Sequence, residues 1–378
     1  GLAAVVAKRG ASLLDIEQVV VHGQLILALL LGIGGEQNEP VLKDLLFEAQ
    51  ALGMTLEFKV MDGEKSLQEG AVRRYAITAL SDQNEALAVQ VIARVLAEFQ
   101  INIESIRQLS DGGLGCFEVI AAETQDAERT LDLRRRLVEE ASHLEIDLAV
   151  ESESLLSRTK RLVVMDMDST LIQIEVIDEL ARLHGVVEKV SAITAKAMAG
   201  EIGFESSLRE RVALLKGLPM EKVRGLVSDL PLTDGAANLL RVLQTLGYKT
   251  GVISGGFMIA ADALKDTLGL DYAYANTLAV VDGKLTGELE GPIVTPQRKA
   301  DLLDTIAQGE GIRLDQTIAI GDGANDMAML ERAGLGIAYH AKPTLKAAAN
   351  TTVSRGGLDR ILYMLGLHAR EVEEILNR

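Results

Sequence analysis

The residues best suited to chemistry in this chain are two aspartates, Asp166 and Asp168, which follow the short apolar run Leu162–Met165. Such a run is typical of a strand that is buried on both faces. Side chains alternate along a strand, so the two carboxylates would point the same way if the strand continued. Two like charges so close repel each other, and a divalent cation such as Mg²⁺, which prefers oxygen ligands, would offset the repulsion. Taken alone, Asp-x-Asp also fits a polar turn after a strand.

Further polar residues follow other strand-like segments. Ser254 and Gly255 come after residues 249–252, Asp322 follows a second apolar run, and Lys299 lies on a helix-like segment between them. In an open parallel sheet, ligands bind at the carboxyl ends of the strands. Together these residues would supply acids for a metal, and a hydroxyl, backbone amides and a cation for a phosphate group.

As a set, the motifs resemble the haloacid dehalogenase superfamily of phosphotransferases, whose nucleophile is an aspartate. The resemblance is carried by Asp166-Met-Asp-Ser-Thr170, Val252-Ile-Ser-Gly-Gly-Phe257 and Gly321-Asp-Gly-Ala-Asn-Asp326, and it spans residues 160–366. It is strongest for members that act on O-phospho-L-serine. It therefore implies a phosphoric monoester hydrolase that releases L-serine through an aspartyl-phosphate intermediate, which is the last step of serine biosynthesis.

The resemblance also implies a role for each matching residue. Asp166 would attack phosphorus, and Asp168 would protonate the leaving oxygen and then activate water, which requires Asp168 to hold a proton while Asp166 does not. Mg²⁺ would be bound by Asp166, by the backbone carbonyl of Asp168 and by Asp322. The phosphate-binding residues would be Ser254, Gly255, Lys299 and Asn325, with Asp326 and Thr170 in support.

Residues 175–230 interrupt the strand pattern with four segments of helical periodicity. An all-helical insertion directly after the first strand would form a lid over the strand ends, like the cap of the superfamily. A phosphorylated amino acid needs an anion for its ammonium and a cation for its carboxylate, and the matching residues are Glu175 and Arg211. Arg209 lies about 200° from Arg211 around a helix, so only one of the two can face the site.

Two apolar residues of the same insertion, Met198 and Phe204, match positions that close over the substrate in the superfamily. Packing within the helical insertion is the alternative explanation for both. The five histidines fall at no spacing typical of metal ligands.

The elements that must position these side chains alternate between strands and helices over residues 231–366. Alternation predicts an α/β fold, a Rossmann-like doubly wound parallel sheet with helices on both faces, and Val280–Leu289 reads as a hairpin within it. We expect the phosphatase domain to span residues 160–378 with the cap inserted, and residues 151–160 to be a polar linker.

Residues 1–150 contain a weak internal repeat, because residues 11–19 resemble residues 101–109. The second copy predicts the order βαββαβ, a ferredoxin-like unit. The first copy, which would end in a strand at residues 55–60, lacks its opening strand. We therefore expect residues to be missing before the first one. The pattern resembles a pair of ACT domains, modules that sense amino acids, and we place them at residues 1–65 and 70–152.

Two roles remain open for these ACT-like domains. Such modules usually carry a glycine in the turn after their first strand, where ligand approaches, whereas the second copy has Ser81-Asp-Gln-Asn84 there. This departure argues against amino-acid binding, and a dimerising or spacing role is the alternative. The strand-like segments 19–21 and 25–31 are more apolar than one face of a small sheet requires. This excess suggests burial against another subunit or against the catalytic domain. We expect a homodimer held mainly through residues 1–150.

Composition narrows the class of partner and the compartment. The net charge of −17 argues against a nucleic acid or an anionic membrane as the partner, and the longest apolar run, Leu25–Ile33, is too short to span a bilayer. The one cysteine, Cys116, fits a reducing cytoplasm. The rival hypotheses are the same chemistry on phosphohomoserine or a sugar phosphate, and a serine-sensing regulatory protein. The complete pair of acids argues against the regulatory protein.

Overall fold

The computed structural model describes residues 1–21, 24–33, 38–60, 73–81, 85–110, 115–123, 130–142, 144, 146–154, 159–349 and 351–378. The chain divides into two compact units, Gly1–Glu69 and Gly70–Arg378. In the part of the chain that is described, no helix is long and apolar enough to cross a membrane.

The first unit packs two helices with an antiparallel pair of strands. Its elements are α1 (Leu2–Lys8), β1 (Ser12–Val21), β2 (Gln24–Gly32) and α2 (Asn38–Ala51). The strand expected at residues 55–60 is not formed, and that prediction was wrong. In the second unit the last strand of the same pattern pairs with the first strand, and the described part of the first unit holds no strand that could be such a partner.

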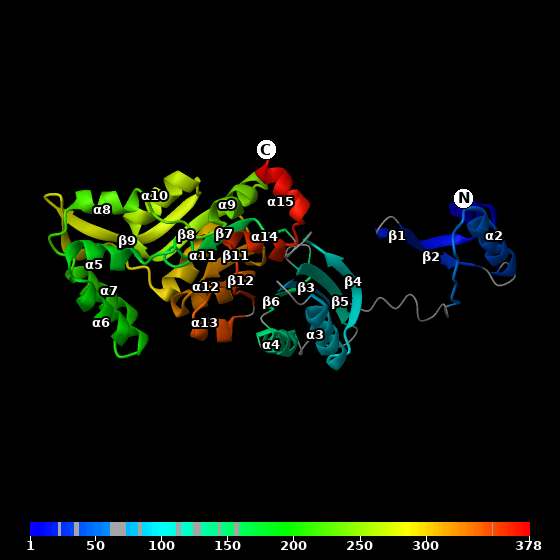
Figure 1. Ribbon diagram of the computed structural model, residues 1–378, viewed down its shortest axis with the longest axis horizontal. Helices are drawn as coiled ribbons and strands as arrows, with labels where there is room; N and C mark the ends of the chain where they lie inside the picture. Colours follow the sequence, from blue (N-terminus) through cyan, green and yellow to red (C-terminus); the bar gives the residue numbers. More distant parts are fainter. Residues whose placement is uncertain are drawn as a thin grey trace. The chain divides into compact units, whose positions relative to one another are not determined.

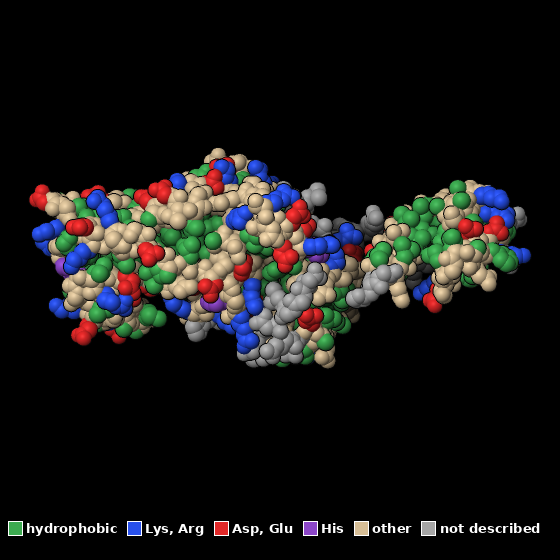
Figure 2. Space-filling model, turned by 45° about the horizontal axis from the view of Figure 1, so that its top comes forward, with side chains coloured by type: hydrophobic (Ala, Val, Ile, Leu, Met, Phe, Trp, Pro, Cys, Tyr) green, Lys and Arg blue, Asp and Glu red, His purple; other side chains and the backbone are tan. Residues whose placement is uncertain are grey.

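The strand pair of the first unit leaves many apolar side chains in solvent. Figure 2 shows a group of hydrophobic side chains on the face of this unit that is in view. The residues of its two strands that are exposed in this way are Leu13, Leu14, Ile16, Val19, Val20, Leu25 and Ile26. The sequence predicted more apolar side chains in these strands than one face of a small sheet requires, and this unit does not bury them.

The second unit begins with the predicted βαββαβ fold. Its elements are β3 (Arg73–Ser81), α3 (Glu85–Glu98), β4 (Asn102–Gln108), β5 (Gly115–Glu123), α4 (Thr130–Ser142) and β6 (Asp147–Ser152), and the antiparallel sheet has the order β4-β5-β3-β6. Glu151 and Ser152, expected in the linker, belong to β6 instead. The Glu151 carboxylate pairs with buried Lys160 at 2.6 Å, because burial of the lysine requires an opposite charge.

This small sheet is covered on both faces. Residues such as Ile77 and Val119 pack with α3 and α4, whereas Leu80, Cys116 and Ala149 belong to the apolar cluster of the catalytic region. At its edge, β6 contacts β13, where Asp147 accepts hydrogen bonds from the Thr352 hydroxyl at 3.2 Å and from the Ser354 amide at 2.8 Å.

The rest of the second unit is a seven-stranded sheet with the order β10-β9-β8-β7-β11-β12-β13. All neighbouring strands are parallel except the hairpin β9–β10, as predicted. The strands are β7 (Leu162–Met165), β8 (Lys249–Phe257), β9 (Tyr272–Val281), β10 (Lys284–Glu290), β11 (Thr317–Gly321), β12 (Leu335–Tyr339) and β13 (Thr352–Val353). The helices around them are α9 (Ala236–Thr245), α10 (Met258–Leu268), α11 (Pro296–Gly309), α12 (Met327–Arg332), α13 (Pro343–Ala348), α14 (Ile361–Met364) and α15 (Ala369–Leu376).

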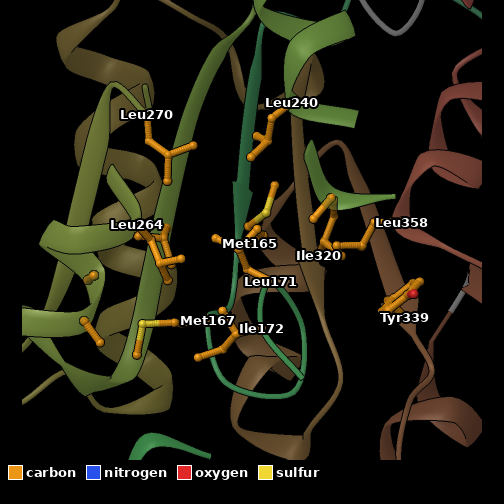
Figure 3. Close-up of a cluster of buried hydrophobic side chains, with 14 of the residues drawn as sticks. Met165, Met167, Leu171, Ile172, Leu240, Leu264, Leu270, Ile320, Tyr339 and Leu358 are labelled. Atoms are coloured by element: carbon orange, nitrogen blue, oxygen red, sulfur yellow. The ribbon is translucent and has the colours of Figure 1, made fainter. Parts of the chain in front are cut away.

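Strand β7 at the centre is buried on both faces, as its apolar run predicted. Val163 and Met165 belong to one apolar cluster, while Leu162 and Val164 belong to another, since successive side chains point to opposite faces. Figure 3 shows Met165 in the first of these clusters. The end of β7 is thus held rigidly in the middle of the sheet.

The predicted helical insertion follows β7 directly. It consists of α5 (Val176–His184), α6 (Val187–Met198), α7 (Phe204–Ala213) and α8 (Met220–Val227). In Figure 1, α5, α6 and α7 lie together beside the sheet. Contacts of α5 with β8, of α7 with β10 and of α8 with α10 join the insertion to the sheet region.

Candidate active site

Asp166 lies at the point where β7 ends. Its backbone amide donates to the Ile320 carbonyl of β11 at 2.9 Å, so the neighbouring strand determines where the aspartate sits. Its Oδ1 accepts the Met167 amide at 2.7 Å, and its Oδ2 lies 2.8 Å from Lys299 Nζ and 3.3 Å from the Asn325 amide nitrogen. Both carboxylate oxygens are therefore held by donors.

Three buried acids meet at this edge of the sheet. Ligand oxygens of Asp166, Asp322 and Asp326 all lie within 4.8 Å of one another. Burial and the Asp166 charge raise the pKa of Asp326 to about 7. Burial also raises the pKa of Asp322, against the opposing charge of Lys342. So many acids in a buried cluster disfavour full ionisation, and a divalent cation with oxygen ligands fits this donor set.

Lys299 supplies a buried positive charge to the same cluster. The side chain is fully buried on α11, and its Nζ lies 2.8 Å from Asp166 and 2.7 Å from Asp326. Burial alone would lower the pKa of Lys299, but the two carboxylates raise it above its ordinary value. Thr295 is the N-cap of this helix, because its hydroxyl accepts the Arg298 amide at 3.2 Å, and Lys299 therefore lies near the start of the helix.

Asp168 does not join the acid cluster. The strand ends at Met165, and the chain turns through Ser169 at a positive φ of 58°, so the alternation expected for a continuing strand does not apply. The Asp168 carboxylate instead accepts the Val176 amide at 3.0 Å. Burial and the neighbouring Glu175 raise the pKa of Asp168 well above its usual range. The two aspartates of the motif are therefore in different environments.

The end of β8 passes close to Asp168. A Cβ on Gly256 would lie 2.4 Å from Asp168 Oδ2, so the backbone approaches this carboxylate closely. Buried Ser254 accepts the Gly256 amide with its hydroxyl oxygen at 2.8 Å. A Cβ on Gly255 would meet the Phe204 ring of the insertion at 3.0 Å. The backbone of this segment can thus approach both the acids and the cap.

Of the cap residues, Glu175, Arg211 and Phe204 lie toward the site. Glu175 accepts the Ser169 hydroxyl at 2.9 Å, and burial raises its pKa. Burial lowers the pKa of Arg211, while Glu175 and the aspartates around it oppose that shift. Arg209, by contrast, is exposed and pairs with Glu205 at 2.9 Å.

Met198 is not brought to the site. Its side chain is 76% exposed at the end of α6. Met198 matches a position that closes over the substrate in the superfamily, but here it contacts neither the acids nor Gly255. Thr170 is brought in, since its hydroxyl lies 3.4 Å from Asp322 Oδ1.

Two residues beside the site were missed by the sequence analysis. Lys342, between β12 and α13, lies 3.0 Å from Asp322 Oδ2. It follows the end of a parallel strand, as Asp322 does, so the preference of ligands for the carboxyl ends of strands could have identified it. Asn276 is buried in β9 and donates to the carbonyls of Gly255 and Gly256. Its signal was a polar side chain in a strand whose other residues are mostly apolar or aromatic, a position that disfavours Asn.

The chain is similar in sequence to proteins of known family. A profile described as haloacid dehalogenase-like hydrolase matches residues 160–334, and two ACT-domain profiles match residues 1–59 and 74–151. A phosphoserine phosphatase of Streptomyces coelicolor is 41% identical over 378 residues, which cover 99% of this chain and 90% of that protein.

Two solved structures are similar in fold. A haloacid dehalogenase family hydrolase of Salmonella enterica has a TM-score of 0.67 at 28% identity, over 77% of this chain and 98% of that chain. A phosphoserine phosphatase described as a phospho-aspartyl intermediate analogue has a TM-score of 0.52 at 48% identity. That match covers 55% of this chain and 99% of the other, so the relative corresponds to little more than half of this chain.

Proposed function

This chain belongs to the phosphoserine phosphatases of the haloacid dehalogenase-like hydrolases, and we infer that it hydrolyses O-phospho-L-serine to L-serine and phosphate in serine biosynthesis. The observation that carries this inference is the contrast between two neighbouring aspartates. Asp166 faces the ammonium of Lys299, whereas burial raises the pKa of Asp168. In the proposed reaction, Asp166 acts as the nucleophile and Asp168 as the proton donor.

The reaction follows in two displacements. In the first, an Asp166 oxygen forms a bond to phosphorus, the bond from phosphorus to the serine oxygen breaks, and the Asp168 proton moves to that oxygen. In the second, Asp168 takes a proton from water, the water oxygen bonds to phosphorus, and the Asp166 carboxylate is released. Lys299 and the end of β8 at Ser254 and Gly255 would hold the phosphate oxygens, with Asn325 beside them.

We propose Mg²⁺ as the metal of this site. Asp166, Asp322 and the Asp168 carbonyl would hold it, with Asp326 as a further acid in the cluster and Thr170 in support. When bound, the ion would offset the charge of the acids and stabilise the charge on the transferring phosphoryl group. The support for this proposal is the all-oxygen donor set.

Substrate choice is assigned to the cap. Arg211 would make a bidentate contact to the substrate carboxylate and Glu175 would bind the ammonium, because both lie toward the acids from the insertion. Phe204 would cover the substrate from above Gly255. Arg209 faces solvent and is given no role.

We further propose a cytoplasmic homodimer held through the first unit. The support is the apolar surface that β1 and β2 leave exposed, together with the pairing tendency of open sheet edges. A chain beginning at Gly70 retains the packing of β3–β6 on the catalytic region, so it is the appropriate truncation. Light scattering should find the full chain dimeric and this shorter chain monomeric, and a dimer of the shorter chain would contradict the proposal.

Phosphate release from L-phosphoserine, with and without Mg²⁺, tests the main inference. Release should require the ion and should be absent in Asp166→Asn, whose amide cannot form the intermediate. Faster turnover of phosphohomoserine or of a sugar phosphate would assign the chain to another substrate. A folded wild-type protein without turnover on any of them would favour the regulatory alternative.

A further inference from the structure

Asn276 is a buried polar residue in a strand of the large sheet. It lies in β9 with a side chain that is 2% exposed, among residues that are mostly apolar or aromatic. An amide buried in this way is unfavourable unless its hydrogen bonds are made. The hydrogen bonds of the Asn276 side chain join it to two segments, and both belong to the proposed phosphate site.

The first segment is the end of β8. The regular pairing of β8 with β9 is interrupted between Ile253 and Phe257, so the intervening residues lie outside the normal ladder. The Asn276 amide nitrogen donates to the Gly255 carbonyl at 2.7 Å and to the Gly256 carbonyl at 3.2 Å. One side chain therefore replaces ladder hydrogen bonds that the irregularity removes.

The second segment leads into α11. Asn276 Oδ1 accepts the Val294 amide at 2.8 Å, one residue before the Thr295 cap of the helix that carries Lys299. The orientation of the side-chain amide follows from its partners, because the nitrogen faces two carbonyls and the oxygen faces an N–H group. Asn276 thus ties the Gly255 segment to the start of the Lys299 helix.

The Gly255 segment lies close to both Asp168 and the cap. A Cβ at Gly256 would lie 2.4 Å from Asp168 Oδ2, and one at Gly255 would lie 3.0 Å from Phe204. A small displacement of the segment would change its distance to the proton donor and to the cap together. Displacement by about 1 Å can reduce a rate roughly 10²-fold.

We propose that Asn276 is a positioning residue for phosphate binding, which sets the Gly255 backbone and the Lys299 helix at the separation that a phosphoryl group requires. The proposal rests on the inferred phosphatase activity, but not on which phosphate ester is the natural substrate. Asn276 touches no reacting atom in this assignment. Its effect should therefore appear as phosphate affinity rather than as a general loss of stability.

The matched control is Gln244 on α9. Its side-chain amide also crosslinks two carbonyls, those of Leu268 at 3.0 Å and Gly269 at 3.1 Å, and it lies near Thr250 at the opposite end of β8. Loss of this amide should lower the melting temperature without affecting phosphate. Asn276→Asp keeps the oxygen that accepts from Val294 but turns an acceptor toward the Gly255 and Gly256 carbonyls.

The experiment compares wild type, Asn276→Asp, Asn276→Ser and Gln244→Ala. Inhibition by inorganic phosphate is measured with p-nitrophenyl phosphate as the substrate, beside KM and kcat for L-phosphoserine and the melting temperature. In Asn276→Asp, the phosphate inhibition constant should rise at least about tenfold and kcat/KM should fall roughly 10²-fold. Asn276→Ser should lose less, because it turns no carboxylate toward the two carbonyls. Gln244→Ala should keep both constants within about twofold.

An unchanged phosphate constant in the folded Asn276→Asp protein would overturn the proposal. If that variant does not fold, Asn276→Ser decides by the same measurement. A loss of phosphate affinity in Gln244→Ala as large as in the Asn276 variant, at an equal loss of melting temperature, would also overturn it. If the wild-type protein hydrolyses p-nitrophenyl phosphate but not phosphoserine, the proposed substrate is refuted. The proposal for Asn276 is still tested in that case, because the inhibition constant for phosphate can still be measured.

Discussion

Replacing Lys299 by methionine should destabilise the catalytic region more than any single surface substitution. The ammonium lies 2.8 Å from Asp166 and 2.7 Å from Asp326, with all three side chains buried. At an effective dielectric constant of about 20, each contact corresponds to about 6 kcal/mol of attraction. Desolvation of the ions offsets much of this, and removing one partner of a buried ion pair typically costs about 3–5 kcal/mol.

The assay is urea unfolding followed by far-UV circular dichroism, at neutral pH and in the presence of a chelator. Methionine keeps most of the length of the lysine side chain, so the lost charge dominates the expected 3–5 kcal/mol, roughly the range for a broken buried pair. The control is Lys249→Met. Lys249 makes a similar 2.9 Å pair with Asp271 but is 41% exposed, and solvent screening should leave that variant near wild type.

Added Mg²⁺ provides a second test of the same reasoning. If the ion binds the acid cluster, it should stabilise Lys299→Met more than wild type, because in the variant no ammonium offsets the carboxylates. Equal stability of Lys299→Met and wild type in the chelator, or equal losses in the two lysine variants, would refute the argument that burial makes this pair different.

Three other predictions follow from single contacts. Asp168→Asn should fold normally and slow turnover by roughly 10²–10⁴-fold, and wild-type rates would remove Asp168 as the proton donor. Arg211→Ala should weaken phosphoserine turnover by about 2–5 kcal/mol while sparing an aryl phosphate, with exposed Arg209→Ala as the control, and equal losses on both substrates would contradict the assignment. Burial raises the pKa of Asp147, so its contribution to stability is present below its unfolded pKa of about 3.9 and is lost as the pH rises through the folded pKa. The melting temperature of Asp147→Asn should therefore fall less with rising pH than that of wild type, and a steeper fall would show the opposite sign.

Much of the catalytic fold could be predicted because its signals are local. The apolar run Leu162–Met165 predicts a buried strand, and the structure divides its side chains between two faces. Alternating strands and helices predict a parallel sheet, whose carboxyl edge then gathers the ends of β7, β8 and β11. The meeting of Asp166 and Asp322 follows from that topology alone.

The internal repeat was informative where strand partners exist within the chain. The βαββαβ order of residues 73–152 formed as predicted, whereas residues 55–60 remained outside any strand. An alternating apolar pattern indicates that a segment can form a strand, but the strand forms only where a neighbouring strand pairs with its backbone N–H and C=O groups. The apolar character of Leu80 and Ala149 likewise did not reveal that this sheet packs against the catalytic region.

The amino-acid sequence by itself determined which residues stand at the strand ends and therefore which chemistry is available. Only the tertiary structure decided their partners. It placed Asp326 rather than the Asp168 carboxylate in the acid cluster, buried Lys299 between two acids, and brought Asn276 against the irregular end of β8. The physical reason is that these pairings join segments separated by many residues, and packing of the sheet and helices, rather than local preference, determines their distances.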